Sequence, residues 1–282
     1  MKKILSLTGL GIGAAALAVF VQSCGILGGP ALNVQVGAAT DSTVQVVWTA
    51  PVEGAADNYL VYFKAVGETT FAFVGETTAS VYVHDPRGFT GTYKVTAVFG
   101  SESYESPEKP TTIPVHGDTI TLFELNADSS RCAYGWDRDS GLGEHYSMAT
   151  VGSAGAVDFY ISDFQTGYAR SPYALVSPDK ADSIDLGAVG IVPEAAWRSN
   201  GFSNLLGGEE APLPAFKTAP PTYFIYTELV QLPALVGVYT AGDDEKHYAL
   251  VKVHEASTVT GACRVETWFQ MVQGLRLIRH TR

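Results

Sequence analysis

Two short segments, Thr43–Trp48 (TVQVVW) and Tyr59–Lys64 (YLVYFK), decide the fold class of this chain. In the first, apolar and polar side chains alternate, and a period of two is the period of side chains on a half-buried β-strand; the second is a short run of apolar and aromatic residues, which is also typical of a strand. Ala50 and Pro51 follow the first segment and end it, because proline cannot donate to a strand ladder. The sequence therefore predicts two strands joined by a turn.

Segments of the same kind lie on either side of these two, and Gly, Pro and Asp turns separate them at roughly ten-residue intervals. No apolar periodicity of helical length interrupts the series. This spacing is typical of a Greek-key β-sandwich of about 85 residues. The additional predicted strands are Leu32–Val36, Phe71–Val74, Ser80–His84 and Thr92–Phe99.

These residues resemble a fibronectin type III domain over roughly residues 30 to 115. Trp48 closes the second strand, as the core tryptophan of that family does, and Tyr93 stands where its tyrosine corner would be. The sequence departs from the family at His84–Gly88 (HDPRG), where a leucine usually precedes a Pro-Gly turn. The resemblance implies a spacer or a protein-contact domain and no chemistry.

A second domain follows the Pro-rich stretch Glu105–Pro114 (ESPEKPTTIP), which ends the first. We assign residues 31–115 to the fibronectin type III-like domain and residues 117–282 to a second β-rich, sandwich-like domain of unrecognised type, so that the fold class is all-β. Segments rich in β-branched and aromatic residues support this. They are Thr119–Leu125, Val157–Ile161, Tyr223–Glu228, Ala234–Thr240, Tyr248–His254 and Val265–Val272.

The N-terminus has the pattern of an export signal, because two lysines precede the uncharged apolar run Ile4–Val21. The run ends in Val21-Gln22-Ser23-Cys24, which resembles the lipobox of a bacterial lipoprotein. The resemblance implies that residues 1–23 are a signal peptide, that Cys24 is acylated and holds the protein on a membrane, and that residues 24–30 are a tether. Ordinary secretion and a retained transmembrane anchor are the alternatives.

The location implied by this signal is the cell envelope. Gly25 follows the lipidated cysteine, and the absence of Asp there resembles lipoproteins sent to the outer membrane. The chain has 18 Lys and Arg against 29 Asp and Glu, a net charge of −11. This excludes binding to a nucleic-acid backbone and makes adhesion to anionic lipid by charge unfavourable. The lipid must therefore supply the membrane contact.

The remaining cysteines, Cys132 and Cys263, form an even pair in an oxidising compartment. We therefore predict a disulfide between the beginning and the end of the second domain; two buried free thiols are the alternative. Neither cysteine has a histidine at zinc-ligand spacing in its own segment. The sequence predicts no metal site and no cofactor.

Residues 166–221 are rich in Gly, Pro, Ser and Asp, and they form too long an excursion for a simple connection. Such loops often carry function, so we place the candidate ligand site there. Trp197 is the expected anchor, with Arg198 and Asn200 beside it to supply polar contacts. The alternative is that Trp197 caps the domain core, and its solvent accessibility separates the two interpretations. Other aromatic contacts expected there are Tyr168, Tyr173 and Phe202.

No Gly-x-Ser-x-Gly, His-Glu-x-x-His, P-loop or Cys-His motif is present, and the sequence names no catalytic residue. We predict a non-catalytic binding, adhesion or structural module whose partner is a protein or a carbohydrate. One alternative is a tethered hydrolase acting on polysaccharide, with its site in loops of residues 117–282. A weaker one is haem or metal uptake through His145, His247 and His254. A close Asp/Glu pair in a cleft would favour the hydrolase, and an exposed aromatic platform would favour binding.

Overall fold

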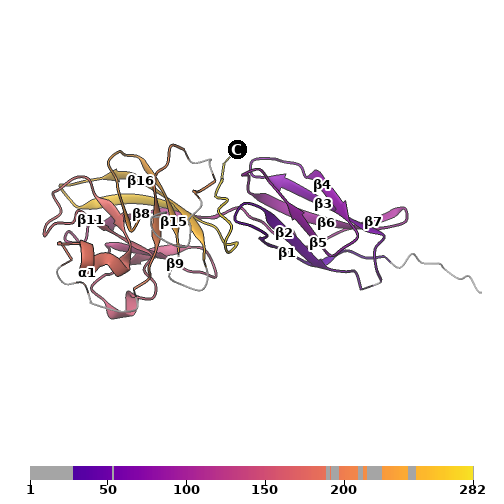
Figure 1. Cartoon of the computed structure of the whole chain (residues 1–282), viewed down its shortest axis with the longest axis horizontal. Helices are drawn as coiled ribbons and strands as arrows, with labels where there is room; N and C mark the ends of the chain where they lie inside the picture. The colour runs from indigo at the N-terminus through magenta and orange to yellow at the C-terminus, as the bar shows by residue number, and fades with distance from the viewer. Residues whose placement is uncertain are drawn as a thin grey trace, which may run out of the picture.

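The computed structural model describes residues 28–52, 54–188, 191, 197–208, 212–214, 224–240 and 246–281. Almost all regular structure in this part of the chain is β-strand, which confirms the all-β class. Two bodies lie side by side along the long axis (Figure 1). The helical pieces are short: the 3-10 turns Val151–Ser153 and Pro178–Lys180, and α1 (Ala181–Ile184).

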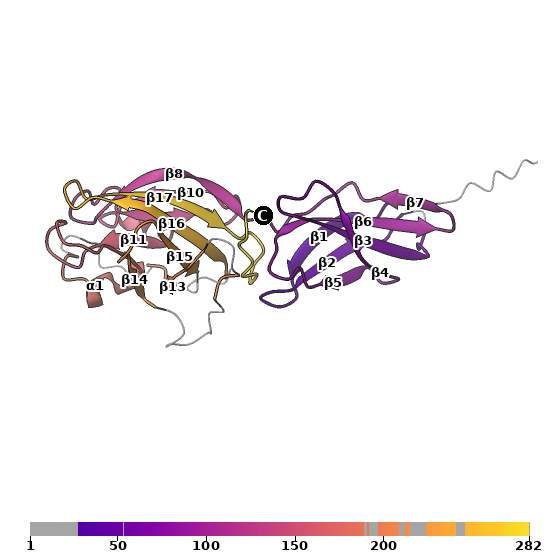
Figure 2. The ribbon, with the colours of Figure 1, turned by 90° about the horizontal axis from the view of Figure 1, so that it is seen from above.

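The first body is a sandwich of two antiparallel sheets whose strands run roughly along the long axis (Figure 2). Three strands in the order β1-β2-β5 face four in the order β4-β3-β6-β7, which is the division of strands expected of a fibronectin type III-like domain. The first sheet consists of β1 (Leu32–Ala38), β2 (Val44–Thr49) and β5 (Val81–His84). The second consists of β3 (Asn58–Ala65), β4 (Ala72–Thr77), β6 (Gly91–Phe99) and β7 (Glu102–Glu105).

The alternating residues of β2 and β3 build the core of this sandwich. Val44, Val46 and Trp48 point inward from β2 and are buried. Tyr59 and Val61 meet them from β3, and the rings of Trp48 and Tyr59 pack edge to face with centroids 5.2 Å apart. The period of two in the sequence therefore marks the two inner faces of the sandwich.

His84, at which the sequence departs from the family pattern, contacts a buried tyrosine inside the fold. Tyr93 is fully buried on β6, and its hydroxyl lies 2.9 Å from Nδ1 of His84. Burial raises the pKa of Tyr93 and lowers the pKa of His84, since both charged forms would lose their hydration. A histidine at this position thus satisfies a tyrosine hydroxyl that would otherwise be buried without a hydrogen bond.

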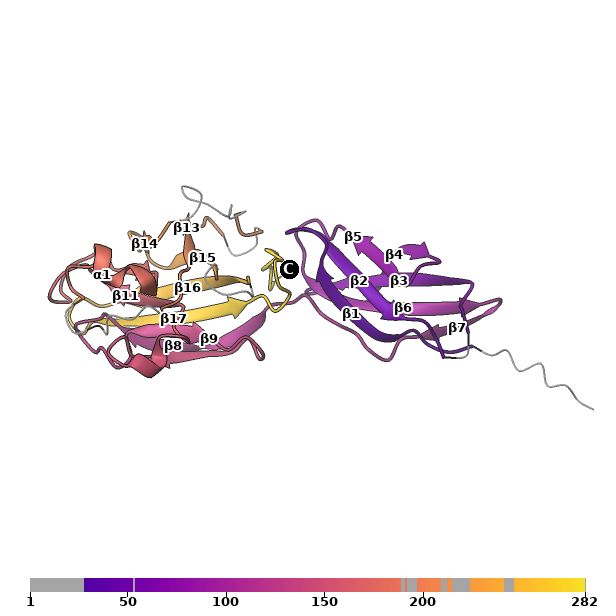
Figure 3. The same cartoon turned by 60° about the horizontal axis from the view of Figure 1, so that its bottom comes forward.

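The second body also contains two antiparallel sheets, seen edge-on in Figure 3. One has the order β10-β9-β11-β12-β14, and the other has the order β13-β15-β16-β17-β8. The first sheet consists of β9 (Ala133–Trp136), β10 (Gly143–Tyr146), β11 (Phe159–Ser162), β12 (Ala174–Val176) and β14 (Tyr226–Glu228). The second consists of β8 (Val115–Phe123), β13 (Gly201–Leu205), β15 (Ala234–Tyr239), β16 (Tyr248–Ala256) and β17 (Ala262–Phe269).

The main core of this body lies between its two sheets. Trp136 and Phe159 come from one sheet, and Val251 and Phe269 come from the other. The rings of Trp136 and Phe269 stack with centroids 5.5 Å apart, so the sheets interdigitate as the layers of a sandwich do. A second apolar cluster, which includes Met148 and Tyr160, covers residues of β9, β11 and β12 that lie outside the main core.

The C-terminal segment that follows β17 joins the two bodies, and it lies between them in each view (Figures 1–3). Val272, Leu275 and Leu277 belong to the core of the first sandwich, although the chain order places them at the end of the second domain. Gln270 Nε2 donates to the carbonyl oxygen of Thr112 at 2.8 Å. The first domain is therefore completed by residues from the last part of the chain.

No helix in the described part of the chain is long and apolar enough to cross a membrane. The signal peptide, Cys24 and most of the tether lie outside the described residues.

Candidate functional site

The structure contradicts the expectation that Trp197 is an exposed anchor. Its side chain is 8% exposed and belongs to the apolar cluster that covers Tyr160 and Met148. The outer faces of β11 and β12 are apolar and need to be covered, and the chain that returns from α1 covers them with this indole. Trp197 therefore caps a core.

Arg198 and Asn200 do not line an open site either, because both contact the buried carboxylate of Asp158. Arg198 Nη1 lies 3.1 Å from Asp158 Oδ2, and Asn200 Nδ2 lies 3.0 Å from Oδ1. Arg138 completes the arrangement from the other side, with Nη2 2.7 Å from Asp158 Oδ1. Asp158 is fully buried, so these donors are what makes its charge tolerable there.

The remaining aromatic candidates of residues 166–221 differ in solvent exposure. Tyr173 and Phe202 are buried, whereas Tyr168 is 36% exposed. The hydroxyl of Tyr173 donates to the main-chain carbonyl of Tyr168 and lies 3.2 Å from that of Ser257. This pair therefore fastens a loop to the domain, and the excursion presents no aromatic platform in its described part.

The predicted disulfide is absent: Cys132 and Cys263 are buried free thiols. Cys263 lies in the main core between the sheets, whereas Cys132 lies in the outer cluster with Tyr160. Burial raises the pKa of each thiol to about 12. The even count of cysteines was misleading because the fold places the two side chains in different apolar clusters.

The histidines proposed for haem or metal uptake are not brought together. His247 is buried, with Nδ1 2.8 Å from the carbonyl oxygen of Gln270, and His254 Nε2 lies 2.8 Å from Glu266 Oε2. His145 lies on β10, in the other sheet. Among the described residues, no group of three or more His, Cys, Asp or Glu side chains has a geometry that could hold a metal ion.

Among the described residues of the second domain, the carboxyl group of Glu124 is close enough to those of Asp163 and Asp185 to feel their charges, and all three residues are buried. Glu124 is fully buried and accepts hydrogen bonds from the main-chain N–H groups of Asn126, at 2.7 Å, and Asp163, at 3.3 Å. Burial raises the pKa of Glu124 to about 7. Substrate has no access to this carboxyl, so it does not form the exposed acid pair that a glycoside hydrolase needs.

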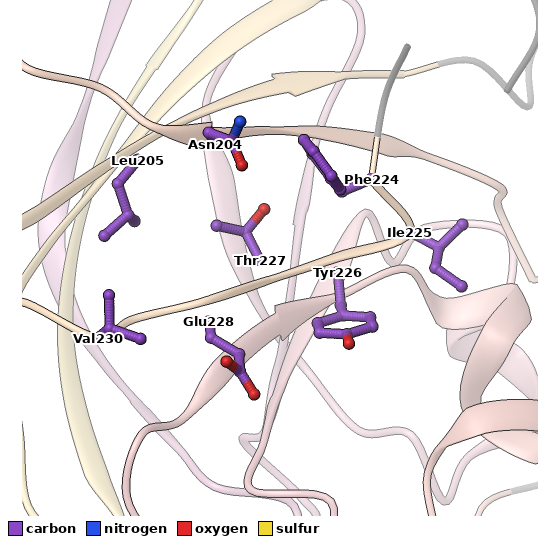
Figure 4. Close-up of a pocket in the computed structure, with 8 residues that line it drawn as sticks. All are labelled: Asn204, Leu205, Phe224, Ile225, Tyr226, Thr227, Glu228 and Val230. Carbon is purple, nitrogen blue, oxygen red and sulfur yellow. The ribbon is translucent and has the colours of Figure 1, made fainter. Parts of the chain in front are cut away.

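A groove of about 510 Å³ lies between β13 and β14, each the edge strand of its own sheet (Figure 4). The two strands are tied at one end, where Phe202 and Phe224 exchange main-chain hydrogen bonds of 2.9 Å. A second tie is the hydroxyl of Thr227, which donates to the carbonyl of Ser203 at 2.6 Å. The groove lies alongside these ties. Its lining consists of Asn204, Leu205, Phe224, Ile225, Tyr226, Thr227, Glu228 and Val230.

Exposed apolar side chains gather around this groove. Phe224 is 45% exposed, Tyr226 38%, Val230 69% and the nearby Leu232 37%. Four large apolar side chains within nine residues of one surface segment are characteristic of an interaction site, whereas single exposed apolar residues are ordinary. We call Phe224, Tyr226, Val230 and Leu232 the apolar rim.

Sequence reasoning identified Tyr223–Glu228 as a strand and missed its role as a site. The alternation in Phe224–Leu232 (FIYTELVQL) predicts that every second side chain shares a face, but that pattern does not say which face is left uncovered. The exposed face became evident only from the burial of the individual side chains in the fold.

Comparisons with known proteins do not assign this chain to a family. No family model matches it, and no curated protein matches it. Among solved structures, a mutant of FN3tt covers 29% of this chain and 90% of its own at 17% identity, with a TM-score of 0.25. FN3tt itself gives 18% identity and a TM-score of 0.22, covering 29% of this chain and 92% of its own. Titin kinase with its flanking domains covers 86% of this chain and 37% of its own at 12% identity, with a TM-score of 0.28.

Proposed function

We propose that this chain is a lipid-anchored binding module of the bacterial cell envelope, located at the outer membrane. Acylated Cys24 would hold it on the membrane, the fibronectin type III-like domain would act as a spacer, and the second domain would bind a partner at the groove between β13 and β14. The observation that carries the proposal is the apolar rim, which exposes side chains of a kind that a monomeric domain normally covers.

The chemistry of the groove favours binding over hydrolysis. Among the described residues, its lining contains one carboxylate, Glu228, and neither His, Cys, Lys nor Arg. Hydrolysis of a glycosidic bond ordinarily uses two carboxyl groups at a defined separation, and a nucleophile needs a base beside it. An apolar lining with few polar groups is instead typical of a recognition surface.

The arrangement of the two bodies suits a tether at the far end of the first body and a groove on the side of the second body (Figure 3). Gly28 lies against Phe99 and Tyr104 of the β6–β7 hairpin, at the end of the first sandwich remote from the second body (Figure 1). The C-terminal segment fastens the bodies together through Leu275 and Leu277. The spacer would therefore hold the groove away from the bilayer.

The anchor is tested by labelling cells with a fatty acid. Cys24→Ser should abolish incorporation of label and leave unprocessed precursor, whereas Cys132→Ser should leave both labelling and processing unchanged. Labelling that survives Cys24→Ser would overturn the anchor. Membrane fractionation tests the location, and recovery in the inner membrane alone would contradict the outer-membrane assignment.

The groove is tested in the same cells with a photo-crosslinking amino acid at position 226, which lies in the apolar rim. Position 259 is the matched control, because Val259 is 83% exposed and lies in the turn between β16 and β17. A discrete adduct that forms from position 226 and not from position 259 supports a partner at the groove. The same pattern of adducts from both positions, or none from 226, contradicts it.

A further inference from the structure

The free edge of β14 faces the groove. On its other edge β14 pairs with β12: Ser177 N donates to Ile225 O at 3.0 Å, and Leu229 N donates to Tyr173 O at 2.7 Å. Main-chain N–H and C=O groups point to opposite sides of a strand at successive residues. Residues 225, 227 and 229 therefore face β12, and Tyr226 and Glu228 present their main-chain groups to the groove.

The neighbouring residue confirms this direction. Phe224 has the same parity as Tyr226 and Glu228, and its N–H and C=O bond to Phe202 of β13. Beyond that point, no strand in the described part of the chain pairs with this side of β14. Tyr226 and Glu228, which alternate with residues that face β12, thus offer two main-chain donors and two main-chain acceptors. They have the spacing of a β-ladder whose second strand is missing.

The free main-chain groups of this edge favour a polypeptide over a sugar. The hydroxyl of Thr227 is already engaged with Ser203, and the polar side chains that remain in the lining are Asn204, Tyr226 and Glu228. The unsatisfied groups are main-chain donors and acceptors at strand spacing, which another extended main chain matches residue for residue. The apolar rim offers contacts for alternate side chains of such a strand.

The charge of the groove and of the whole chain restricts the class of partner further. Glu228 carries the only formal charge among the described residues that line the groove, and the whole chain has a net charge of −11. Opposite charges on neighbouring strands stabilise pairing and like charges oppose it. A basic side chain opposite Glu228 is therefore favoured, and a second copy of this acidic chain is disfavoured.

We infer that the partner binds by strand addition: an extended segment of another protein, with apolar residues and a basic residue, pairs with the free edge of β14. This inference rests on the proposed binding function of the same groove and specifies its mode. It predicts hydrogen bonds between the partner's main chain and Tyr226 and Glu228.

The test uses purified Cys24→Ser protein and a displayed library of linear peptides. Selection should enrich sequences that combine apolar residues with Lys or Arg. Glu228→Pro removes the groove-facing N–H and leaves the β12 ladder intact, because the N–H groups that face β12 belong to the odd-numbered residues. Peptide affinity should fall about tenfold or more in Glu228→Pro. Glu228→Ala, the matched control, keeps the N–H and should lose only the contribution of the charge.

A second measurement does not depend on a variant that folds. Backbone N-methylation is scanned along the selected peptide, and strand pairing predicts that alternate methyl groups abolish binding while those between them are tolerated. An effect without this alternation, or affinity unchanged by Glu228→Pro, overturns strand addition. Loss of binding in Tyr226→Ala and Val230→Asp would in that case still support the groove itself. A selected peptide should bind wild-type protein and should not bind Val230→Asp. If no such peptide is found, strand addition is overturned, and the crosslinking experiment still tests the groove.

Discussion

The main-chain N–H of Arg276 donates to the carbonyl oxygen of Asp41 at 2.8 Å, although 235 residues separate them in the sequence. Asp41 lies in the turn between β1 and β2, and Arg276 lies in the segment after β17. Two further ties accompany this one. The guanidinium of Arg279 lies 4.0 Å from the centre of the Phe89 ring, and Thr90 donates its hydroxyl to the carbonyl of Arg279. The last part of the chain thus belongs structurally to both domains.

Leu275→Ala tests this coupling. Leu275 is fully buried in the core of the first sandwich, so its truncation should lower the free energy of unfolding by about 2–5 kcal/mol. Leu186→Ala is the control, because that side chain is 79% exposed and should change stability by about 0.5 kcal/mol or less. Amide hydrogen exchange in β2 and β6 measures the effect within the first domain. Exchange there that stays at the wild-type rate would contradict the coupling.

Asp158→Asn tests the buried ion cluster of the second domain. The change keeps the shape and removes the charge, which leaves Arg138 and Arg198 without their counter-ion; we expect a loss of about 3 kcal/mol or more. The matched control is Asp139→Asn, since Asp139 is exposed. Denaturant titration of both variants measures the difference. Equal midpoints would show that the cluster contributes no stability through the charge of Asp158.

Glu124 predicts a specific dependence of stability on pH. Its pKa is about 7 when folded and about 4.3 in an unfolded chain, so the unfolded state releases the proton first as the pH rises. The contribution of neutral Glu124 to the free energy of unfolding is therefore complete below about pH 4. It falls between about pH 4 and 7 and stays low at higher pH. The change is on the order of 3–4 kcal/mol.

Glu124→Gln should remove this part of the pH dependence. The readout is the slope of the unfolding free energy between pH 4 and 7, and any constant cost of the amide does not affect it. Glu255→Gln, at an exposed position, should keep the wild-type slope. Parallel curves for wild type and Glu124→Gln would show that the carboxyl does not titrate in this way.

The two free thiols predict the outcome of alkylation. In native Cys24→Ser protein, burial and a pKa of about 12 should make Cys132 and Cys263 react slowly with iodoacetamide, and both should react after unfolding without a reductant. Ser101→Cys provides an exposed thiol that should react rapidly in the native state. Mass spectrometry counts the modified sites. An unfolded protein that takes up label only after reduction would restore the disulfide.

The sequence by itself determined the strands whose side chains alternate over enough residues. In the first sandwich, every second side chain is buried in the segments around Val44, Val61 and Val95. Burial of one face gives a strand a period of two, which can be recognised from the sequence alone. The segments of β8, β16 and β17 in the second domain were predicted from their β-branched and aromatic residues. The short strands β9, β10, β12 and β13 were missed, since three to five residues give no measurable period. Pairing with neighbouring strands makes them strands, as β9 does for β10 and β15 does for β13.

Tertiary structure alone decided the site. Trp197 and Tyr226 are both aromatic residues of the second domain, and nothing local distinguishes a buried one from an exposed one. Trp197 is buried because it covers the outer face of a sheet, whereas Tyr226 is 38% exposed on β14, which pairs with a neighbouring strand of its sheet on one edge only. Which edge of a sheet remains free depends on the complete order of its strands. The strand order arises from contacts between residues far apart in the chain, and it cannot be predicted from the periodicity of any single segment.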